Sequence, residues 1–363
     1  MILIVSHFTK NKGTTDYFRD YLISKKVKHY YLRHPFTFIN ELLYSELVYF
    51  DGNKEKVISK YRKISIPALD MMRNFLVSFY VSLKLNKRVH KVFAFGSFNT
   101  LPFIIFKQIF KRDIVFWGVD YSTKRFDSSV LNKIYVYTET AACLFADSVF
   151  NLTKRQETAR IANHKLDKQK SSILPSGIHD IDFKKDFTKY QNISLLYIGS
   201  ITRQHGIVDF VKRYYIDGNI QYPIYIYGGG ESVKEMVDLI EEHKISKLVK
   251  FYGVKNQNQI KNFISSLDER VFGIAPYNKD HSDHVYYGDS LKVREYLNYN
   301  IPFIVPNFLY VADELVEFGL TYKNFQELDK LLLELDKFIF NKSKKYEVLK
   351  KYNWKNIFNE IIL

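Results

Sequence analysis

The first half of the chain alternates short apolar runs with amphipathic stretches. The apolar runs predict buried strands at residues 1–6, 91–96, 113–118 and 148–152. Apolar positions spaced three or four apart predict helices at residues 14–23, 99–110, 131–145 and 154–163. This alternation is typical of an α/β fold with a parallel sheet and helices on both of its faces.

The second half repeats the pattern as far as about residue 337. Strands are predicted at residues 195–199, 224–230, 249–254, 271–276 and 301–305, and a terminal helix at residues 346–362. The segment 181–191 is polar and rich in lysine, which is typical of a linker. A chain of 363 residues exceeds the usual size of one hydrophobic core. We therefore predict two domains, at residues 1–185 and 186–342, followed by a terminal segment at 343–363.

The net charge of +15 is carried by the first half alone. Residues 1–185 hold 31 Lys and Arg against 16 Asp and Glu, whereas residues 186–363 hold 23 of each kind. Such a surface attracts acidic sugars, an anionic membrane or nucleic acid, although it also serves simply to keep a protein in solution. Nucleic acid is the weakest of these partners, because no zinc-finger, ribonucleoprotein or helix-turn-helix signature is present.

Residues 68–88 form an apolar stretch that closes with Lys84, Lys87 and Arg88. A helix of this kind lies either at a lipid interface or in the core of the first domain, and the sequence leaves both open. No run of about 18 apolar residues predicts a spanning helix, and residues 1–6 are too short for the apolar part of a signal peptide. The single cysteine, Cys143, lies in an apolar run and is expected to be buried. We expect a cytoplasmic protein, with the inner face of the cell membrane as a candidate partner.

The turn Gly288-Asp289-Ser290 opens an amphipathic helix that leads into an apolar strand. The first turn of a helix offers unpaired N–H groups and a positive dipole end, which suit a diphosphate. Lys292 adds a positive charge there, and Glu295 lies three residues further along the same face, where a carboxylate can accept sugar hydroxyls. The alternative is a capped helix with a Lys292–Glu295 surface pair.

A second stretch, residues 172–183 (SILPSGIHDIDF), resembles the "V-I-P-N-G-V-D-x-x-x-F" segment of nucleotide-sugar-dependent glycosyltransferases with the GT-B fold. The strands ending at Gly199 and at the turn Gly228–Gly230, the segment 249–254 and the strand 271–276 follow in that family's order. The resemblance implies two Rossmann-like domains facing a cleft. The second domain would hold the donor and the first the acceptor, and the C-terminal helix, at residues 343–363, would pack back on the first domain.

The same resemblance implies the residues that contact the donor. The 288–290 turn and Lys292 would hold the diphosphate, Glu295 the ribose, and the segment 252–254 the nucleobase. The family's "G-R-L-x-x-x-K-G" is altered here, because Ser200 and His205 stand where Arg and Lys are usual. The expected donor contacts are Arg203, His205, Gly229, Tyr252, Val254, Gly288, Asp289, Ser290, Leu291, Lys292 and Glu295.

Tyr287 replaces the first carboxylate of the Glu-x7-Glu pair of many retaining members. Residues 290–292 with Glu295 instead resemble the "S-M-K-x-x-Q" element of the inverting glucuronosyltransferase of xanthan assembly. An inverting transfer needs a general base. Asp120, just past a first-domain strand, is our candidate, with an Asx-turn as the alternative role. Asp16 is the reserve candidate, although a carboxylate in the first turn of a helix is also a common stabilising feature.

Gly13 and Thr14, after the first strand, are the expected acceptor contacts. We expect no metal and no cofactor. The pair Asp180 and Asp182 is explained by the family segment in which it lies. The partners we expect are a nucleotide sugar, a glycan or lipid-linked acceptor and an anionic membrane surface, and no nucleic acid. The sequence thus favours a glycosyltransferase; a GT-B nucleotide-sugar epimerase and an inactive glycan-binding or scaffold subunit are the alternatives.

Overall fold

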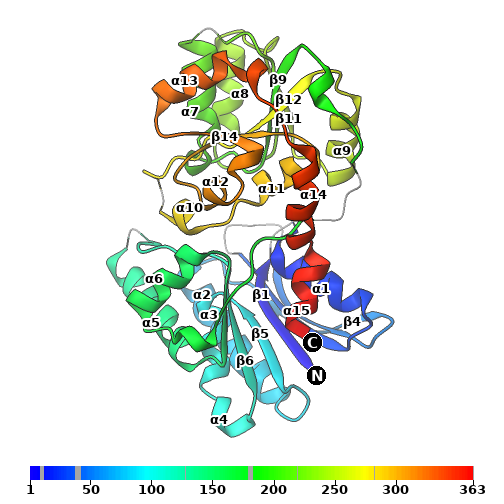
Figure 1. Ribbon diagram of the computed structural model, residues 1–363. Coiled ribbons are helices and arrows are strands. Elements are labelled where there is room, and N and C mark those ends of the chain that lie inside the picture. The colour runs from blue at the N-terminus through cyan, green and yellow to red at the C-terminus, as the bar shows by residue number, and fades with distance from the viewer. Residues whose placement is uncertain are drawn as a thin grey trace. The chain divides into compact units, whose positions relative to one another are not determined.

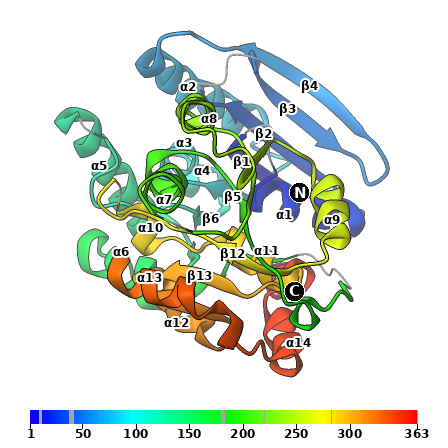
Figure 2. The same cartoon turned by 90° about the horizontal axis from the view of Figure 1, so that it is seen from above.

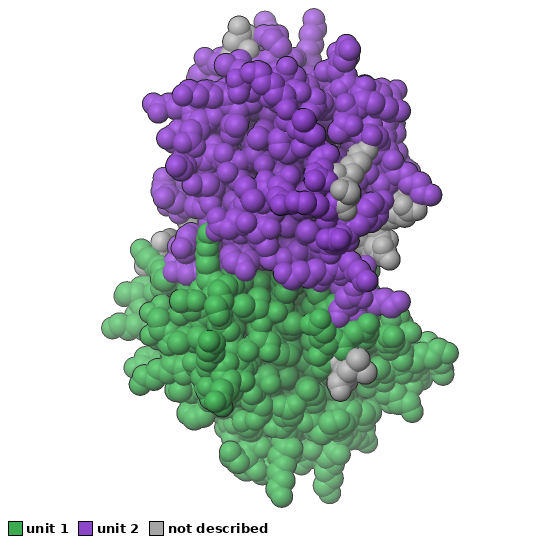
Figure 3. Space-filling view, viewed as in Figure 1, with its two compact units in different colours: residues 1–175, 357–363 green, residues 176–356 purple. Residues whose placement is uncertain are grey.

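The computed structural model describes residues 1–8, 12–36, 42–126, 128–178, 183–218, 220–281 and 283–362. The chain divides into two compact units (Figure 3). Unit 1 comprises residues 1–175 and 357–363, and unit 2 comprises residues 176–356. The division precedes the boundary that we predicted after Lys185, since Phe183 and Phe187 are buried in a core of unit 2.

Unit 1 is built on an eight-stranded sheet with the order β4-β3-β2-β1-β5-β6-β7-β8. Its strands are β1 (Ile2–Phe8), β2 (His29–Pro35), β3 (Tyr44–Phe50), β4 (Glu55–Arg62), β5 (Lys91–Phe95), β6 (Asp113–Gly118), β7 (Ser148–Asn151) and β8 (Ser171–Ile173). β3 pairs antiparallel with both β2 and β4, and the other neighbours pair parallel. The predicted parallel sheet therefore carries an antiparallel extension at one edge.

Helices cover both faces of this sheet (Figure 1). They are α1 (Thr14–Ser24), α2 (Pro67–Lys84), α3 (Ser97–Ile104), α4 (Lys107–Phe110), α5 (Ser129–Phe145) and α6 (Lys154–His164). Successive side chains along each strand point to opposite faces of the sheet. Val92 and Ala94 belong to the same core as Val81 of α2 and Phe103 of α3. Phe93, which lies between them on β5, packs instead on Phe18 of α1, as does Trp117 of β6.

Unit 2 is a six-stranded parallel sheet with the order β11-β10-β9-β12-β13-β14. Its strands are β9 (Ile193–Ile198), β10 (Ile224–Tyr227), β11 (Val249–Gly253), β12 (Arg270–Ile274), β13 (Phe303–Pro306) and β14 (Gly319–Tyr322). Its α-helices are α7 (Ile207–Val211), α8 (Val233–Glu242), α9 (Gln257–Ser266), α10 (His284–Tyr287), α11 (Leu291–Asn298), α12 (Tyr310–Glu314), α13 (Phe325–Leu333) and α14 (Lys342–Lys351). Two separate cores, one on each face, make this a second Rossmann-like layer structure.

The predicted terminal helix is two helices, α14 and α15 (Trp354–Ile362), separated at Tyr352 and Asn353. The break arises because this backbone pairs with a distant strand-like segment. Ile178 N donates to Tyr352 O at 2.7 Å, and Trp354 N donates to Ile178 O at 3.1 Å. Beyond the break, Phe358 packs on Phe18 of α1, with ring centroids 5.3 Å apart. The last turns of α15 thus belong to unit 1. Two parallel-sheet units of this kind confirm the predicted α/β fold class.

None of the helices that the structure describes is both long and apolar enough to cross a membrane.

Candidate functional site

The carboxyl ends of β9 and β12 lie side by side in the sheet of unit 2, and α11 follows β12 after a loop and the short helix α10. In an open parallel sheet this edge is the place where ligands bind. β9 ends in Gly199, and the loop after β12 carries Tyr277. The candidate donor site is built from these two strand ends and the first turns of α11.

Lys292, in the first turn of α11, lies in an aromatic cage. Its Nζ donates a hydrogen bond of 3.1 Å to Tyr197 Oη, and the Tyr197 hydroxyl in turn donates to Ser200 O at 2.5 Å. Nζ lies 4.4 Å from the ring centroid of Tyr197 and 4.5 Å from that of Tyr277. A Cβ at Gly199 would lie 2.9 Å from this Nζ. The site therefore needs glycine at 199 to leave room for the Lys292 ammonium.

The Lys292 ammonium is buried without a counter-anion. Only 7% of the residue is exposed, and no ion pair among the described residues includes it. Burial therefore lowers the pKa of Lys292 to about 7. A buried cation that lacks a carboxylate partner is costly unless an anion compensates for it, so this position is suited to an anionic ligand.

Helix α11 supplies further donors beside this cation. Ser290 is its N-cap residue, but the Ser290 side chain makes no capping bond and its Oγ lies 3.2 Å from Tyr277 Oη instead. The first N–H groups of the helix, from Leu291 onward, have no partner within the helix. A phosphate group can therefore accept bonds from backbone N–H groups and from Lys292 at the same end of the helix.

Glu295 follows Lys292 by one helical turn and is partly exposed. Its carboxylate has no hydrogen-bond or ion-pair partner among the described residues, and burial raises its pKa to about 7. The Lys292–Glu295 surface pair, which was the alternative to a ligand site, is therefore not formed. A carboxylate that has no hydrogen-bond donor beside it, at the edge of the site, is suited to accept hydrogen bonds from the hydroxyl groups of a sugar.

Asp289 has a different role from the predicted ligand contact. Its side chain is fully buried and accepts bonds from Arg294 Nε at 3.0 Å, Arg294 Nη2 at 2.9 Å and Ser176 N at 2.7 Å. Arg294 Nη2 also donates to Glu314 at 2.7 Å. With both oxygens occupied, the Asp289 carboxylate holds the turn before α11 in place and does not face a ligand.

His205 ends the short turn η3 (Arg203–His205), where its Nδ1 lies 2.6 Å from Thr202 Oγ1. Its ring is 5.1 Å from that of Tyr277, next to the Lys292 cage. Burial, together with the charge of Lys292, lowers the pKa of His205 to about 2, so the imidazole is neutral. His205 thus borders the donor site but cannot replace the missing cation.

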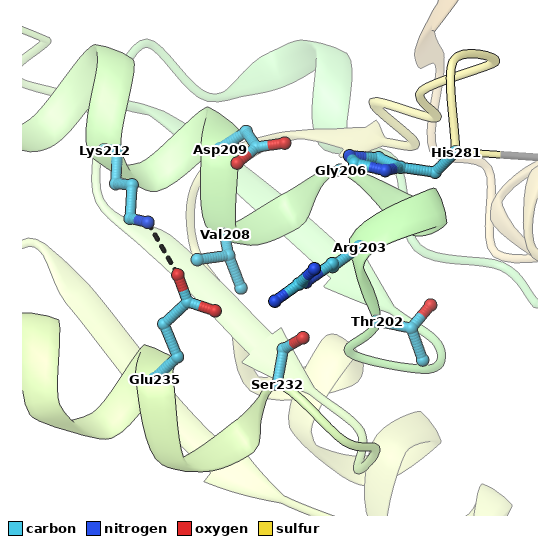
Figure 4. Close-up of a pocket in the computed structure, with 9 residues that line it drawn as sticks. All are labelled: Thr202, Arg203, Gly206, Val208, Asp209, Lys212, Ser232, Glu235 and His281. Carbon is cyan, nitrogen blue, oxygen red and sulfur yellow. Dashed lines mark hydrogen bonds and ion pairs between the residues drawn. The ribbon is translucent and has the colours of Figure 1, made fainter.

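Arg203 is exposed and lines a cavity of about 240 Å³ in unit 2. The other residues that line it are Thr202, Gly206, Val208, Asp209, Lys212, Ser232, Glu235 and His281. Figure 4 shows the Arg203 guanidinium inside this cavity, beside the ion pair of Lys212 and Glu235, whose atoms are 2.6 Å apart. Neither Lys292 nor Glu295 lines the cavity. The expected donor contact of Arg203 therefore stays a prediction, because the cavity that Arg203 lines does not include Lys292.

The proposed nucleobase residues gather at the ends of β10 and β11. The rings of Tyr227 and Tyr252 stack with centroids 4.9 Å apart and planes at 11°. Val254 is largely exposed, and a Cβ at Gly229 would lie 2.8 Å from its Cγ2. Gly228 is also required, because a Cβ there would lie 1.8 Å from Gly199 O. The glycine turn thus lies against the loop after β9, and the partly exposed ring of Tyr252 offers a flat apolar face for a base.

In unit 1, Asp120 follows the carboxyl end of β6 and is exposed. Its carboxylate pairs with Arg125 at 3.5 Å. Its main-chain oxygen accepts a bond of 3.1 Å from Arg160. The Arg160 guanidinium is fully buried, pairs with Glu139 at 3.1 Å and occupies the space that a side chain at Gly118 would fill. Asp120 is therefore held at the strand end by its backbone while its carboxylate stays accessible.

Asp16 acts as a helix cap. Its Oδ2 accepts a bond of 2.9 Å from Gly13 N, at the start of α1. This is the stabilising role that the sequence left open, and it occupies one oxygen of the reserve base. Gly13 is the N-cap residue and Thr14, which is buried, the first residue of α1.

Sequence reasoning missed His7, near the carboxyl end of β1. Asn99 Nδ2 donates to Phe95 O at 2.7 Å and contacts His7 Nδ1 at 3.2 Å. Because the Asn99 nitrogen is the donor in both contacts, the neutral imidazole carries its proton on Nε2. Burial lowers the pKa of His7 to about 4. His7 is thus a hydrogen-bond donor at the ligand-binding edge of unit 1, and its position at a strand end was the signal that could have identified it.

Tyr197 and Tyr277 were missed for another reason, since nothing local in the sequence indicates that two tyrosines near strand ends enclose one lysine. Among the described residues, no cluster of three or more His, Cys, Asp and Glu side chains is arranged to hold a metal ion. The pair Asp180 and Asp182 lies outside the described residues.

Two Rossmann-like units joined in this order, with a helix returning from the second to the first, define the GT-B fold of glycosyltransferases. The chain is similar over 99% of its length to sucrose-phosphate synthase from Thermosynechococcus elongatus, with a TM-score of 0.73, 15% identity and 96% of that chain covered. HepE of Anabaena in complex with UDP-glucose gives a TM-score of 0.67 at 14% identity, covering 99% of this chain and 97% of that one. The lipopolysaccharide outer core galactosyltransferase WaaB gives 0.65 at 12% identity, covering 99% and 98%. No protein-family model and no curated protein sequence matches the chain.

Proposed function

We propose that the protein transfers a sugar from a nucleoside diphosphate sugar to a glycan or lipid-linked acceptor. The observation that carries the proposal is the Lys292 ammonium, which is buried without a counter-anion at the start of α11, with the unpaired Glu295 carboxylate one turn away. A diphosphate would compensate the cation, and a ribose would supply the hydroxyl groups that Glu295 lacks. The GT-B fold, shared with structures that bind UDP and UDP-glucose, supports the same assignment.

In the proposed reaction the acceptor hydroxyl attacks the anomeric carbon of the donor sugar. Asp120 takes the proton of that hydroxyl, and the bond from the anomeric carbon to the diphosphate oxygen breaks. Lys292 and the N–H groups at the start of α11 stabilise the negative charge of the leaving diphosphate. The attack and the departure occur on opposite faces of the carbon, so the transfer inverts its configuration.

The test is a thermal-unfolding screen with UDP, ADP, GDP and CDP, each compared with its nucleoside monophosphate. One diphosphate is expected to raise the unfolding midpoint by roughly 5–10 °C at about 100 times its Kd. Its monophosphate is expected to raise it much less, because it lacks the second phosphate for Lys292. The control for the variant Lys292→Met is Lys234→Met, which changes an exposed lysine on α8. This control should respond to the diphosphate as the wild type does. If no diphosphate or diphosphate sugar moves the midpoint, the proposed function is wrong.

A further inference from the structure

Helix α2 of unit 1 is amphipathic in the reverse sense. The side chains on its inner face are largely polar: Asp70, Asn74, Ser78 and Ser82 are buried and follow one another at intervals of four residues. An ordinary surface helix turns its apolar stripe inward and its polar face to water. Here the polar stripe faces the interior, and the apolar side chains of α2 face the solvent. An exposed apolar stripe of this kind requires an explanation.

The buried polar stripe is satisfied by long-range partners, which shows that the orientation of the helix is built into the unit. Asp70 accepts from Arg73 Nε at 2.9 Å and from a backbone N–H of the preceding loop. Ser78 Oγ lies 2.9 Å from the buried His34 ring, and Ser82 Oγ accepts from Arg112 at 2.7 Å. Rotating the helix to bury its apolar side would break each of these bonds.

The outward face of α2 is wholly apolar. Leu69, Met72, Leu76, Tyr80 and Leu83 recur every three or four residues, and their exposed fractions run from 41% at Leu83 to 57% at Met72. At 100° per residue these five positions fall within one narrow sector of the helix. Five large apolar side chains in one row form a contiguous patch, which marks an interaction surface.

The patch extends onto the neighbouring helices. Phe75 and Phe79 of α2 contact Phe98 of α3 and Phe106, with ring centroids 6.3 and 4.6 Å apart. Ile105 and Ile109, which flank Phe106 in the sequence, are 52% and 70% exposed. Figures 1 and 2 both show α2 beside α3. We define the α2 patch as the five outward residues of α2 together with Ile105 and Ile109.

The charge around this patch identifies its partner. Residues 60–112 contain eleven Lys and Arg and one acidic residue, Asp70, which is buried and paired with Arg73. Lys84, Lys87 and Arg88, at the C-terminal end of α2, are exposed and take part in no ion pair among the described residues. An apolar surface bordered by unpaired cations matches a bilayer whose headgroups are anionic. Association of two copies through this face would instead bring like charges together.

We propose that the α2 patch binds the surface of an anionic lipid bilayer, with its apolar side chains entering the interface and Lys84, Lys87 and Arg88 contacting the lipid phosphates. This goes beyond the proposed function, since it rests on unit 1 alone and requires no nucleotide. It places the protein at a surface on which a lipid-linked acceptor can be presented.

Vesicle sedimentation tests the apolar part of the surface. The wild-type protein is expected to bind vesicles of phosphatidylcholine mixed with phosphatidylglycerol, and to bind pure phosphatidylcholine at least about tenfold more weakly. The triple variant Met72→Gln, Leu76→Gln, Tyr80→Gln should lose at least about tenfold in affinity for the anionic vesicles. A control with two highly exposed apolar residues of unit 2 changed, Leu333→Gln and Ile339→Gln, should bind like the wild type.

The charged part is tested in the same way. The triple variant Lys84→Gln, Lys87→Gln, Arg88→Gln is expected to bind the anionic vesicles at least about tenfold more weakly, and added salt should weaken the wild type similarly. The control variant Lys234→Gln, Lys247→Gln removes exposed lysines of unit 2 and should bind normally.

Three results would overturn the proposal: equal binding to both kinds of vesicle, triple variants that bind as the wild type does, or a dimer in sedimentation velocity that the apolar triple variant dissociates. Circular dichroism and the UDP-dependent unfolding midpoint of each variant show whether it is folded. The two proposals fail separately. A protein that binds UDP but not vesicles contradicts the membrane surface, whereas one that binds vesicles but no nucleotide contradicts the transferase.

Discussion

Replacing Lys292 by Met should stabilise the free protein and abolish tight binding of the diphosphate. Burial lowers the pKa of Lys292 from 10.5 to about 7, and this shift corresponds to roughly 5 kcal/mol of destabilisation when the ammonium is charged. Methionine removes the charge at similar volume. It also removes two contacts to the faces of Tyr197 and Tyr277 and one hydrogen bond, together about 3 kcal/mol. The net gain is about 2 kcal/mol, or roughly 5 °C in the unfolding midpoint.

The pH dependence gives this prediction its sign. Because the folded-state pKa of Lys292 lies below the unfolded value, the destabilisation is complete below about pH 7 and declines as the pH rises toward 10.5. The advantage of Lys292→Met over the wild type should therefore shrink by roughly 3 kcal/mol between about pH 7 and about pH 9.5. Urea unfolding at both values measures it, with Lys234→Met as the control that shows no such change.

Whereas Lys292→Met should stabilise the free protein, it should weaken the binding of UDP. The diphosphate restores the charge of Lys292, so binding takes up a proton above about pH 7, and calorimetry in two buffers of different ionisation enthalpy detects this uptake. Lys292→Met should weaken UDP binding by roughly 30–150-fold, which corresponds to about 2–3 kcal/mol. A variant that is less stable than the wild type at about pH 7, or that binds UDP equally well, would refute the reasoning.

Three further predictions concern other residues of the two units. The affinity for UDP should fall as the pH drops below about 7, where Glu295 becomes protonated. The variant Glu295→Gln should bind UDP weakly at every pH between 6 and 8. If its affinity still falls below about pH 7 as that of the wild type does, the role of Glu295 is contradicted. Asp120→Asn should reduce the rate of sugar transfer by at least about 100-fold while the Kd for UDP stays within about twofold, and a variant that retains transfer excludes Asp120 as the base. Asp289→Asn should lower the free energy of unfolding by about 3 kcal/mol in urea titrations, since it leaves the buried Arg294 short of a partner; a loss below about 1 kcal/mol would show that Glu314 compensates alone.

The sequence predicted the central parallel strands of both sheets because each of them is a continuous apolar run. It missed β2, β3 and β4. The edge strand β4, Glu55–Arg62, is mostly exposed and carries charged residues at alternating positions, so it lacks the apolar signal of a buried strand. The division of the terminal helix was also missed, because it depends on bonds from Ile178 to Tyr352 and Trp354 that join distant parts of the chain.

For the candidate sites, residue types and spacing predicted the helix that follows Ser290 and the strand that ends shortly before Asp120. They could not reveal what each side chain touches. Asp289 and Glu295 look alike in the sequence, yet one is engaged by Arg294 and the other has no partner among the described residues. Periodicity likewise predicted a helix over much of residues 68–88 but not its orientation, because the partners of its polar stripe, such as His34 and Arg112, lie elsewhere in unit 1.

The polypeptide passes from one unit to the other twice, after residue 175 and again after residue 356. During translation, unit 1 therefore stays incomplete until α15 has left the ribosome, and until then the aromatic surface around Phe18 and Trp117 lacks Phe358. A nascent chain of this kind exposes that surface while all of unit 2 is being made. Chains truncated before Phe358 should consequently aggregate or recruit chaperones, even though they retain every strand of both sheets.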